Sequence, residues 1–512
     1  MQKRSIVIIG AGIGGLTAAA LLARQGHSVQ VFEQAWIPGG CASTFRRQGF
    51  TFDVGATQVA GLEPGGIHQR IFEVLETDLP PASPCDPACA VYLPGETHPI
   101  SVWRDPLQWQ RERQEQFPGS ERFWALLQTL FQASWRFQSR DPVLPPRNLW
   151  DVGQLFQALR PDTLVTVPHT FRVVTDALQA YGLEGDRRLR TFLDLQLKLY
   201  SQVDASATAL LYAATALSVS QAPQGLFHLE GSMQVLSDRL VEAVKRWGGS
   251  IHCGQTVTGI LTQQNQVTGV RVQDRKTGTV AIVSADQVVA NVTVQNLVQL
   301  LGEEALPPTM AGYAQRVQQL PEGSGAFVLY LGVKRSALPP SCPPHLQFLY
   351  DYDRPQANAP DPISENNSLF VSVSREGDGR APADQATLIA SSFTDLGQWW
   401  QASTDSAQYQ ALKARYTQTA LDRLGRFFDL SPETLVHQEA ATPCTFAHFT
   451  HRDRGAVGGL SQRLASFGPF GFANRTPVGG LWLVGDCTHP GEGTAGVSYS
   501  AWTVARQIEA LY

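Results

Sequence analysis

Residues 5–33 constrain the fold of this chain more than any other segment. A short β-type run, SIVII, leads into the turn Gly10-Ala11-Gly12-Ile13-Gly14-Gly15. A helix-type run follows at residues 16–25, and a second apolar strand, residues 28–32, ends on Glu33. This order of strand, glycine-rich turn, helix, strand and acid is typical of a dinucleotide-binding βαβ unit.

The residue types in this unit fit the chemistry of a bound pyrophosphate. Gly10 permits the tight turn, Gly12 lets the pyrophosphate approach the backbone, and Gly15 lets the helix pack closely on the strand. The helix N-terminus offers free N–H groups and the positive end of its dipole to the phosphates. Glu33 is placed to hold ribose hydroxyls, and an acid there disfavours NADP, so we predict NAD or FAD.

Composition narrows the class of protein further. The chain has 512 residues, enough for two or three domains that share a large core. A net charge of −5 without a long basic run disfavours nucleic acid as a partner. Outside the glycine-rich motif, no strongly apolar stretch reaches the roughly 18 residues of a membrane span. The seven scattered cysteines suit a reducing compartment, and neither they nor the histidines have a spacing that predicts a metal site.

Two more glycine-containing loops follow the unit. They are Pro38-Gly39-Gly40 and Asp53-Val54-Gly55-Ala56-Thr57, and a hairpin around Gln48-Gly49 is expected between them. Backbone in such loops can meet a flat ligand closely. We therefore expect an extended cofactor that continues past the pyrophosphate.

The middle of the chain changes character. Residues 100–160 hold five of the eleven tryptophans, mixed with phenylalanine and arginine. Such a mixture suits a membrane-interface surface, an apolar pocket or the aromatic core of a helical subdomain, and the sequence leaves these alternatives open. Residues 231–247 then predict an amphipathic helix, and residues 324–393 alternate as strands of an antiparallel sheet. A helix is expected at 407–428, and a strand broken by Pro443 is expected at 434–448.

A second motif closes the chain. A strand, residues 481–484, leads to Gly485-Asp486, a loop rich in glycine and proline, and a helix from about Thr494. A carboxylate at the end of a strand can bind a polyol chain. The helix N-terminus that follows can stabilise negative charge on a bound ring.

Together, the segments 10–34, 38–58, 231–291 and 444–501 resemble the FAD-dependent carotenoid desaturase and isomerase family, which is grouped with flavin amine oxidases in a glutathione-reductase-like superfamily. The resemblance implies an α/β fold with a Rossmann-type FAD-binding domain assembled from discontinuous segments, and a substrate domain of mixed antiparallel sheet and helices. We assign the FAD-binding domain to residues 1–75, 227–300 and 476–512. Residues 76–226 are assigned to a helical, aromatic-rich region facing substrate or membrane, and residues 301–475 to the substrate domain.

The resemblance also implies which residues contact FAD. By this resemblance, the first motif binds the ADP half of FAD, and the next two loops flank the pyrophosphate and the flavin. The backbone at Val257 contacts the adenine side, and the last motif contacts the ribityl region and the flavin ring. The residues are Gly10, Gly12, Ile13, Gly14, Gly15, Glu33, Gln34, Gly39, Gly40, Cys41, Gly55, Ala56, Thr57, Val257, Gly485, Asp486, Gly496 and Val497. Many family members have arginine where this chain has Cys41, so a phosphate contact is either lost here or made by Arg46 or Arg47.

Within the family, residues 38–66 and 85–96 look most like the bacterial C-3′,4′ carotenoid desaturases of myxol glycoside synthesis. The expected reaction places a double bond in the acyclic end of a monocyclic carotenoid, with hydride transfer to the flavin and electrons passed on to quinone or oxygen. His489 and Glu492 are the ionisable candidates for catalysis. A cis–trans isomerase resembling prolycopene isomerase, a flavin amine oxidase and a non-catalytic prenyl-binding escort protein remain alternatives. The apolar substrate predicts peripheral association with the cytoplasmic side of a membrane.

Overall fold

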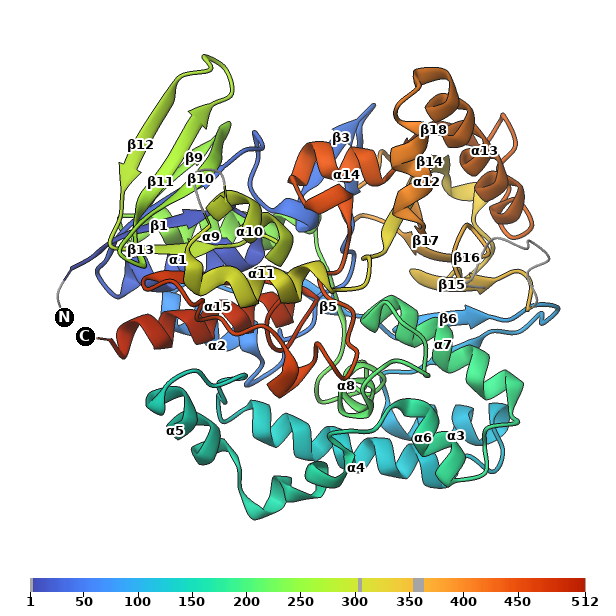
Figure 1. Cartoon of the computed structure of the whole chain (residues 1–512). Helices are drawn as coiled ribbons and strands as arrows, with labels where there is room; N and C mark the ends of the chain where they lie inside the picture. The colour runs from blue at the N-terminus through green and yellow to red at the C-terminus, as the bar shows by residue number, and fades with distance from the viewer. Residues whose placement is uncertain (1–2, 303–305, 353–362, 512) are drawn as a thin grey trace.

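The computed structural model describes residues 3–302, 306–352 and 363–511. Within these residues the chain builds one parallel and one mixed sheet, with a helical region below them (Figure 1). The α/β fold class and the mixed substrate sheet are as the sequence predicts.

The parallel sheet has the strand order β19-β13-β1-β2-β9. Its strands are β1 (Ser5–Ile9), β2 (Ser28–Glu33), β9 (Ser250–Cys253), β13 (Gln287–Ala290) and β19 (Leu481–Leu483). The helices α1 (Ile13–Arg24), α2 (Ile67–Leu75), α9 (Gln234–Arg246) and α15 (Thr494–Glu509) pack together on one face. The other face carries α10 (Val294–Gly302), α11 (Ala311–Gln318) and the antiparallel strands β10 (Gln255–Gln263), β11 (Gln266–Asp274) and β12 (Val280–Ser284). The β3 (Thr44–Arg47) and β4 (Phe50–Asp53) strands form the hairpin expected between the two glycine-containing loops.

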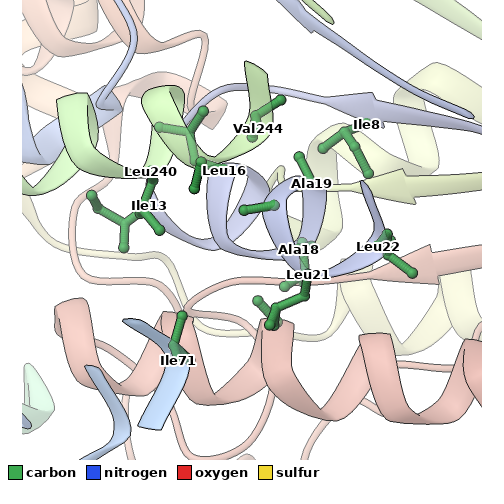
Figure 2. Packing of buried hydrophobic residues seen from close by; sticks show 14 of the residues in the cluster. Ile8, Ile13, Leu16, Ala18, Ala19, Leu21, Leu22, Ile71, Leu240 and Val244 are labelled. Carbon is green, nitrogen blue, oxygen red and sulfur yellow. The ribbon is translucent and has the colours of Figure 1, made fainter. Parts of the chain in front are cut away.

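Helix α1 is the centre of this half. Its side chains are buried on all sides, except at its C-terminal end, because α9, α15 and the sheet enclose it. Figure 2 shows Leu16 and Ile13 beside Leu240 of α9. The helix begins at Ile13, earlier than the expected Leu16, because Gly12 already has the extended backbone of an N-cap residue.

The mixed sheet has the strand order β18-β14-β17-β16-β15-β6-β7. Its strands are β6 (Cys89–Tyr92), β7 (Ile100–Val102), β14 (Gly325–Lys334), β15 (His345–Leu349), β16 (Ser368–Val373), β17 (Gln385–Thr394) and β18 (Leu435–Ala441). Successive side chains along each strand point to opposite faces of the sheet, and both faces are apolar. On β14, Phe327 and Leu329 face α12 (Leu396–Ala402) and α13 (Ser406–Leu424), whereas Val328 and Tyr330 face the opposite way.

The helical region contains α3 (Pro106–Gln116), α4 (Glu121–Gln138), α5 (Leu149–Ala158), α6 (Val174–Ala180), α7 (Arg187–Ser201) and α8 (Leu210–Ala216). Trp109, Phe117, Phe123 and Trp124 are buried together at its centre. Half of the ten tryptophan and phenylalanine residues at 100–160 are therefore buried as a core, while Trp135 and Phe137 line the cavity between the two sheets. Two of the three alternatives left open by the sequence thus each hold in part. Phe156 differs, because its side chain is 69% exposed.

Two sequence-based expectations are wrong. The expected strand at 434–448 ends at Ala441, and residues 443–450 form helix α14 (Pro443–Thr450) instead. Thr442 caps this helix by accepting a hydrogen bond from Thr445 N, and Pro443 takes the first helical position, where its missing N–H is tolerated. The segment 76–226 is not helical throughout, since it contributes β5 (Ala82–Pro84), β6 and β7, and β6 pairs with β15. The short strand β8 (Phe227–Leu229), which follows this segment, pairs with β5.

No helix in the described part of the chain is both long and apolar enough to cross a membrane. Short 3₁₀ turns connect several elements. They are η1 (Gly40–Ala42), η2 (Pro161–His169), η3 (Pro308–Met310), η4 (Arg335–Ala337), η5 (Asp453–Gly455) and η6 (Gly468–Phe470).

Candidate active site

A cavity of about 1660 Å³ lies between the two sheets. Small-molecule pockets usually measure about 300–1,000 Å³, so this space suits a cofactor together with a second, long ligand. Of the predicted site residues, all but Gly15 and Gly485 line the cavity. They come from segments as far apart as β1 and the loop before α15, and the fold brings them together.

The two exceptions lie behind the lining and shape it. A Cβ atom on Gly15 would lie 2.1 Å from the carbonyl oxygen of Gly10, so the helix could not approach the turn with a larger residue. Gly485 has a φ of +121°, which favours glycine. Both positions therefore act on packing and backbone shape.

The turn before α1 fits a dinucleotide. Gly12 is the N-cap without a side-chain hydrogen bond, and the first turn of α1 carries no acid that would compete with a phosphate. A Cβ on Gly12 would lie 2.7 Å from Nδ2 of Asn291, so the glycine keeps this wall of the cavity open. The free N–H groups and the bare backbone match the requirements of a pyrophosphate site.

Glu33 is buried at the end of β2. Its carboxylate accepts hydrogen bonds from the backbone N–H groups of Ala11 (2.7 Å) and Ala35 (2.8 Å). Burial raises the pKa of Glu33 above its usual value, although these two bonds act in the opposite direction. The side chain thus ties the glycine-rich turn to the loop after β2 and remains part of the cavity wall.

Asn291 is a cavity residue that the sequence reasoning missed. It follows β13 directly, and its side chain packs over Gly12 and Gly14. Its one signal in the sequence is a polar residue directly after a short apolar run, which is weak.

Asp486 lies opposite the turn, after β19. Its Oδ2 pairs with Nη1 of Arg452 at 2.9 Å. Burial alone would lower the pKa of Arg452, but the charge of Asp486 outweighs burial and raises it. Arg452 follows α14 and lines the cavity, a placement hidden from the sequence by the incorrect strand at 434–448. Arg46 and Arg47, the expected phosphate ligands, are both exposed, and Arg47 pairs with Glu439 at 3.3 Å.

His489 and Glu492 come from the loop before α15 and differ in their surroundings. His489 Nε2 lies 2.9 Å from Oε1 of Gln138, while Nδ1 has no partner among the described residues. Burial lowers the pKa of His489 to about 4, so the ring is neutral at pH 7. With an amide oxygen as its partner, Nε2 carries the proton and Nδ1 has the free lone pair.

Glu492 lies in surroundings that disfavour its charged form. Burial and the nearby charge of Asp486 raise its pKa well above the usual value. Its Oε2 accepts a hydrogen bond from Nε2 of Gln202 at 3.3 Å, and the same amide nitrogen donates to the carbonyl oxygen of Gly458. One loop therefore brings to the cavity an imidazole that is neutral at pH 7 and a carboxyl group with a raised pKa.

The mixed sheet supplies the opposite wall. Tyr330, Phe370, Ile389 and Phe393 point into the cavity from alternate positions of β14, β16 and β17. Lys198 of α7 also lines it, with Nζ 5.3 Å from the ring centroid of Phe393. This wall is mainly apolar and suits a long hydrocarbon ligand.

Large apolar side chains are exposed along residues 149–171 and at Phe470, and we call this set the apolar rim. This apolar rim consists of Leu149, Phe156, Leu164, Val165, Val167, Phe171 and Phe470. Val167 and Phe470 belong to both the rim and the cavity lining, so the cavity reaches the surface here. The rings of Phe171 and Phe470 contact each other, with centroids 5.6 Å apart.

Comparison with known proteins agrees with this geometry. Residues 8–75 match the model of the NAD(P)-binding Rossmann-like domain. A zeta-carotene-forming phytoene desaturase of Myxococcus xanthus is 27% identical over 99% of this chain and 94% of its own length. The prolycopene isomerase of Daucus carota is 24% identical over 99% of this chain and 80% of its own length. The crystal structure of an oxidoreductase from Methanosarcina mazei superposes with a TM-score of 0.63 at 18% identity, covering 98% of this chain and 99% of that one.

Fold, site and comparisons define the class of the protein as a flavoprotein oxidoreductase. Over its full length, at about 25% identity, it is similar to the carotenoid desaturases and isomerases.

Proposed function

We propose that the protein is an FAD-dependent carotenoid desaturase. The observation that carries this proposal is the single cavity, which joins a dinucleotide-binding turn to a long, mainly apolar wall. The full-length similarity to a phytoene desaturase supports the substrate class. We further propose that residues 1–75, 227–300 and 476–512 hold the cofactor, while residues 301–475 and much of 76–226 surround the substrate.

The residues of this chain would mainly position the substrate, exclude water from the cavity and supply one weak base. Bound FAD would supply the hydride acceptor. The apolar faces of β14, β16 and β17 would hold an extended polyene and exclude water. His489 Nδ1 is the candidate to accept the proton from the neighbouring carbon, because it has a free lone pair and no partner among the described residues. A desaturase also needs an electron acceptor, for which we propose quinone or oxygen.

For the bond, we propose C-3′,4′ desaturation of the acyclic end of a monocyclic carotenoid, on the resemblance of residues 38–66 and 85–96. A carotenoid cis–trans isomerase is the second candidate, and the similarity to a prolycopene isomerase favours it specifically. The test is incubation of the FAD-loaded protein with liposome-borne carotenoids and an acceptor, followed by mass analysis of the products. A desaturase yields a product two hydrogens lighter, whereas an isomerase yields products of unchanged mass.

The remaining alternatives are tested with the same purified protein. A flavin amine oxidase would release peroxide with benzylamine or polyamines. Lys198 in the cavity wall is compatible with this alternative. A prenyl-binding escort protein would be purified without flavin and would leave every substrate unchanged.

The cofactor site has its own test at Asp486. We expect Asp486→Ala to lose FAD, because the change removes a carboxylate from the cavity wall and leaves Arg452 without its partner. The measurement is the flavin content of the purified protein, with Asp238→Ala on the surface of α9 as the control. Asp486→Ala protein with a full complement of FAD would contradict the assignment.

The apolar rim suggests how the substrate arrives. We propose that the rim rests on a membrane surface, from which a water-insoluble carotenoid enters the cavity. Exposed apolar patches of this kind mark interaction sites in soluble-type folds.

A further inference from the structure

We infer that Arg452 binds the diphosphate of the cofactor and takes the place that the sequence analysis assigned to Arg46 or Arg47. The inference rests on the proposed use of FAD.

Arg452 lies between the two loops that flank the N-terminus of α1. On one side is η1. Gly39 N donates to the carbonyl oxygen of Ala11 at 2.8 Å, and a Cβ on Gly40 would lie 3.3 Å from Cα of Gly12. On the other side is Gly485, whose Cα would lie 3.5 Å from a Cβ on Gly14. The turn before α1 is therefore enclosed by these two loops.

Helix α14 connects Arg452 to both loops. It packs against η1, and the carbonyl oxygen of Phe449 near its end accepts a hydrogen bond from Nε2 of Gln34 at 2.8 Å. The helix stops at His451, which has a left-handed backbone with φ of +53°, and Arg452 follows. Its guanidinium then meets Asp486, so it bridges from η1 toward the loop after β19.

The guanidinium is fixed before any ligand arrives. Nε donates to the carbonyl oxygen of Ala456 at 2.6 Å, and Nη1 pairs with Asp486 at 2.9 Å. The turn that holds it is tightly built, because a Cβ on Gly455 would lie 1.9 Å from the carbonyl oxygen of Pro443. Within the described residues, the remaining N–H groups of Arg452 have no protein acceptor, and the side chain lines the cavity.

The other arginines of the cavity wall are engaged elsewhere, and Lys198 lies over the ring of Phe393, with Nζ 5.3 Å from its centroid. Arg47 pairs with Glu439, Arg70 pairs with Asp141, and Arg275 donates to the carbonyl oxygen of Gln34. Cys41, in η1, is uncharged because burial raises the pKa of its thiol. A diphosphate seated on the N-terminus of α1 would thus find its cationic partner in Arg452, whose planar guanidinium suits phosphate oxygens.

The experiment measures binding of FAD, ADP and riboflavin to apo-protein by fluorescence titration and competition. We expect Arg452→Met to weaken FAD and ADP about 10- to 100-fold, the range of a lost charged hydrogen bond, and to leave riboflavin binding within about twofold. Arg47→Met is the matched control, and we expect it to bind all three ligands as the wild type does.

Three results would overturn the inference. They are unchanged FAD and ADP affinity in Arg452→Met, equal losses for ADP and riboflavin, and a loss of ADP affinity in Arg47→Met. Equal losses would show that Arg452 only supports the fold around Asp486. A wild-type apo-protein that binds no FAD would instead refute the proposed function, so the two failures are distinguishable.

Discussion

At the scale of single residues, the most specific prediction concerns Glu492 and the pH dependence of stability. Its pKa in the folded protein is raised well above the value of an unfolded chain, so the folded state favours the protonated side chain. The stability that protonation provides is complete below about pH 4.5 and is lost as the pH rises toward the folded-state pKa. Glu492→Gln removes this loss while it keeps the shape and the contact with Gln202.

We therefore expect Glu492→Gln to melt at the same temperature as the wild type near pH 4.5 and at a higher temperature as the pH rises. Thermal melts across a pH series check this, with Glu242→Gln on the surface of α9 as the control. A Tm difference that is constant over the series would contradict the raised pKa.

At the scale of elements, the close contact of β1 and α1 depends on Gly15. Gly15→Ala would place a Cβ 2.1 Å from the carbonyl oxygen of Gly10, which is backbone and cannot swing away. We expect a loss of roughly 2–4 kcal/mol in the free energy of unfolding, as for overpacked buried sites, together with weaker FAD binding. Urea unfolding measures the loss. Gly153→Ala in α5, where no atom lies within 4 Å of the new Cβ, should be neutral or stabilising.

A buried ion network joins two elements that are distant in sequence. Arg380, before β17, pairs with Asp53 at 3.2 Å and with Asp378 at 3.1 Å, and Asp53 also accepts a hydrogen bond from Met233 N at 2.8 Å. Because Asp53 precedes the loop Val54 to Thr57, this network fixes a wall of the cavity.

Arg380→Met should destabilise the protein by about 3–5 kcal/mol, since it removes the guanidinium that pairs with two buried carboxylates. The urea midpoint provides the measurement, and the surface variant Arg239→Met should change it little. An Arg380→Met midpoint equal to that of the wild type would show that the network does not hold the two parts together.

At the scale of the whole molecule, the apolar rim predicts membrane binding. Phe156 and Phe171 are 69% and 72% exposed, so replacing both with serine should leave folding intact and reduce co-sedimentation with liposomes several-fold. Ile282→Ser on β12 is the matched control, because its side chain is 67% exposed but lies on a different element. Equal losses in both variants would indicate non-specific adsorption.

The sequence predicted the large features because they depend on local pattern. The spacing from Gly10 to Glu33 is sufficient for the βαβ unit, and alternation is sufficient for β14 and β17. It failed where tertiary structure decides. Pro443 ends a strand and begins a helix, and the sequence reasoning allowed for the first effect alone.

The same limit applies to the site. The predicted residues lie in motifs and gather in one cavity, although their roles remain predictions. Arg452 and Asn291 lie in the resembling segments but outside the glycine-containing motifs, and they reach the cavity through the packing of α14 and β13. Their contribution depends on distances between segments that are hundreds of residues apart, which no local pattern encodes.

The central claim is that this cavity oxidises a polyene at the expense of a bound flavin, and one measurement tests it most directly. The FAD-loaded protein is mixed without oxygen or quinone with a liposome-borne monocyclic carotenoid, while the visible absorbance of the flavin is recorded. The account predicts that the flavin absorbance bleaches as one equivalent of desaturated carotenoid forms. An unchanged flavin spectrum with the carotenoid recovered as isomers, or not altered at all, would contradict it.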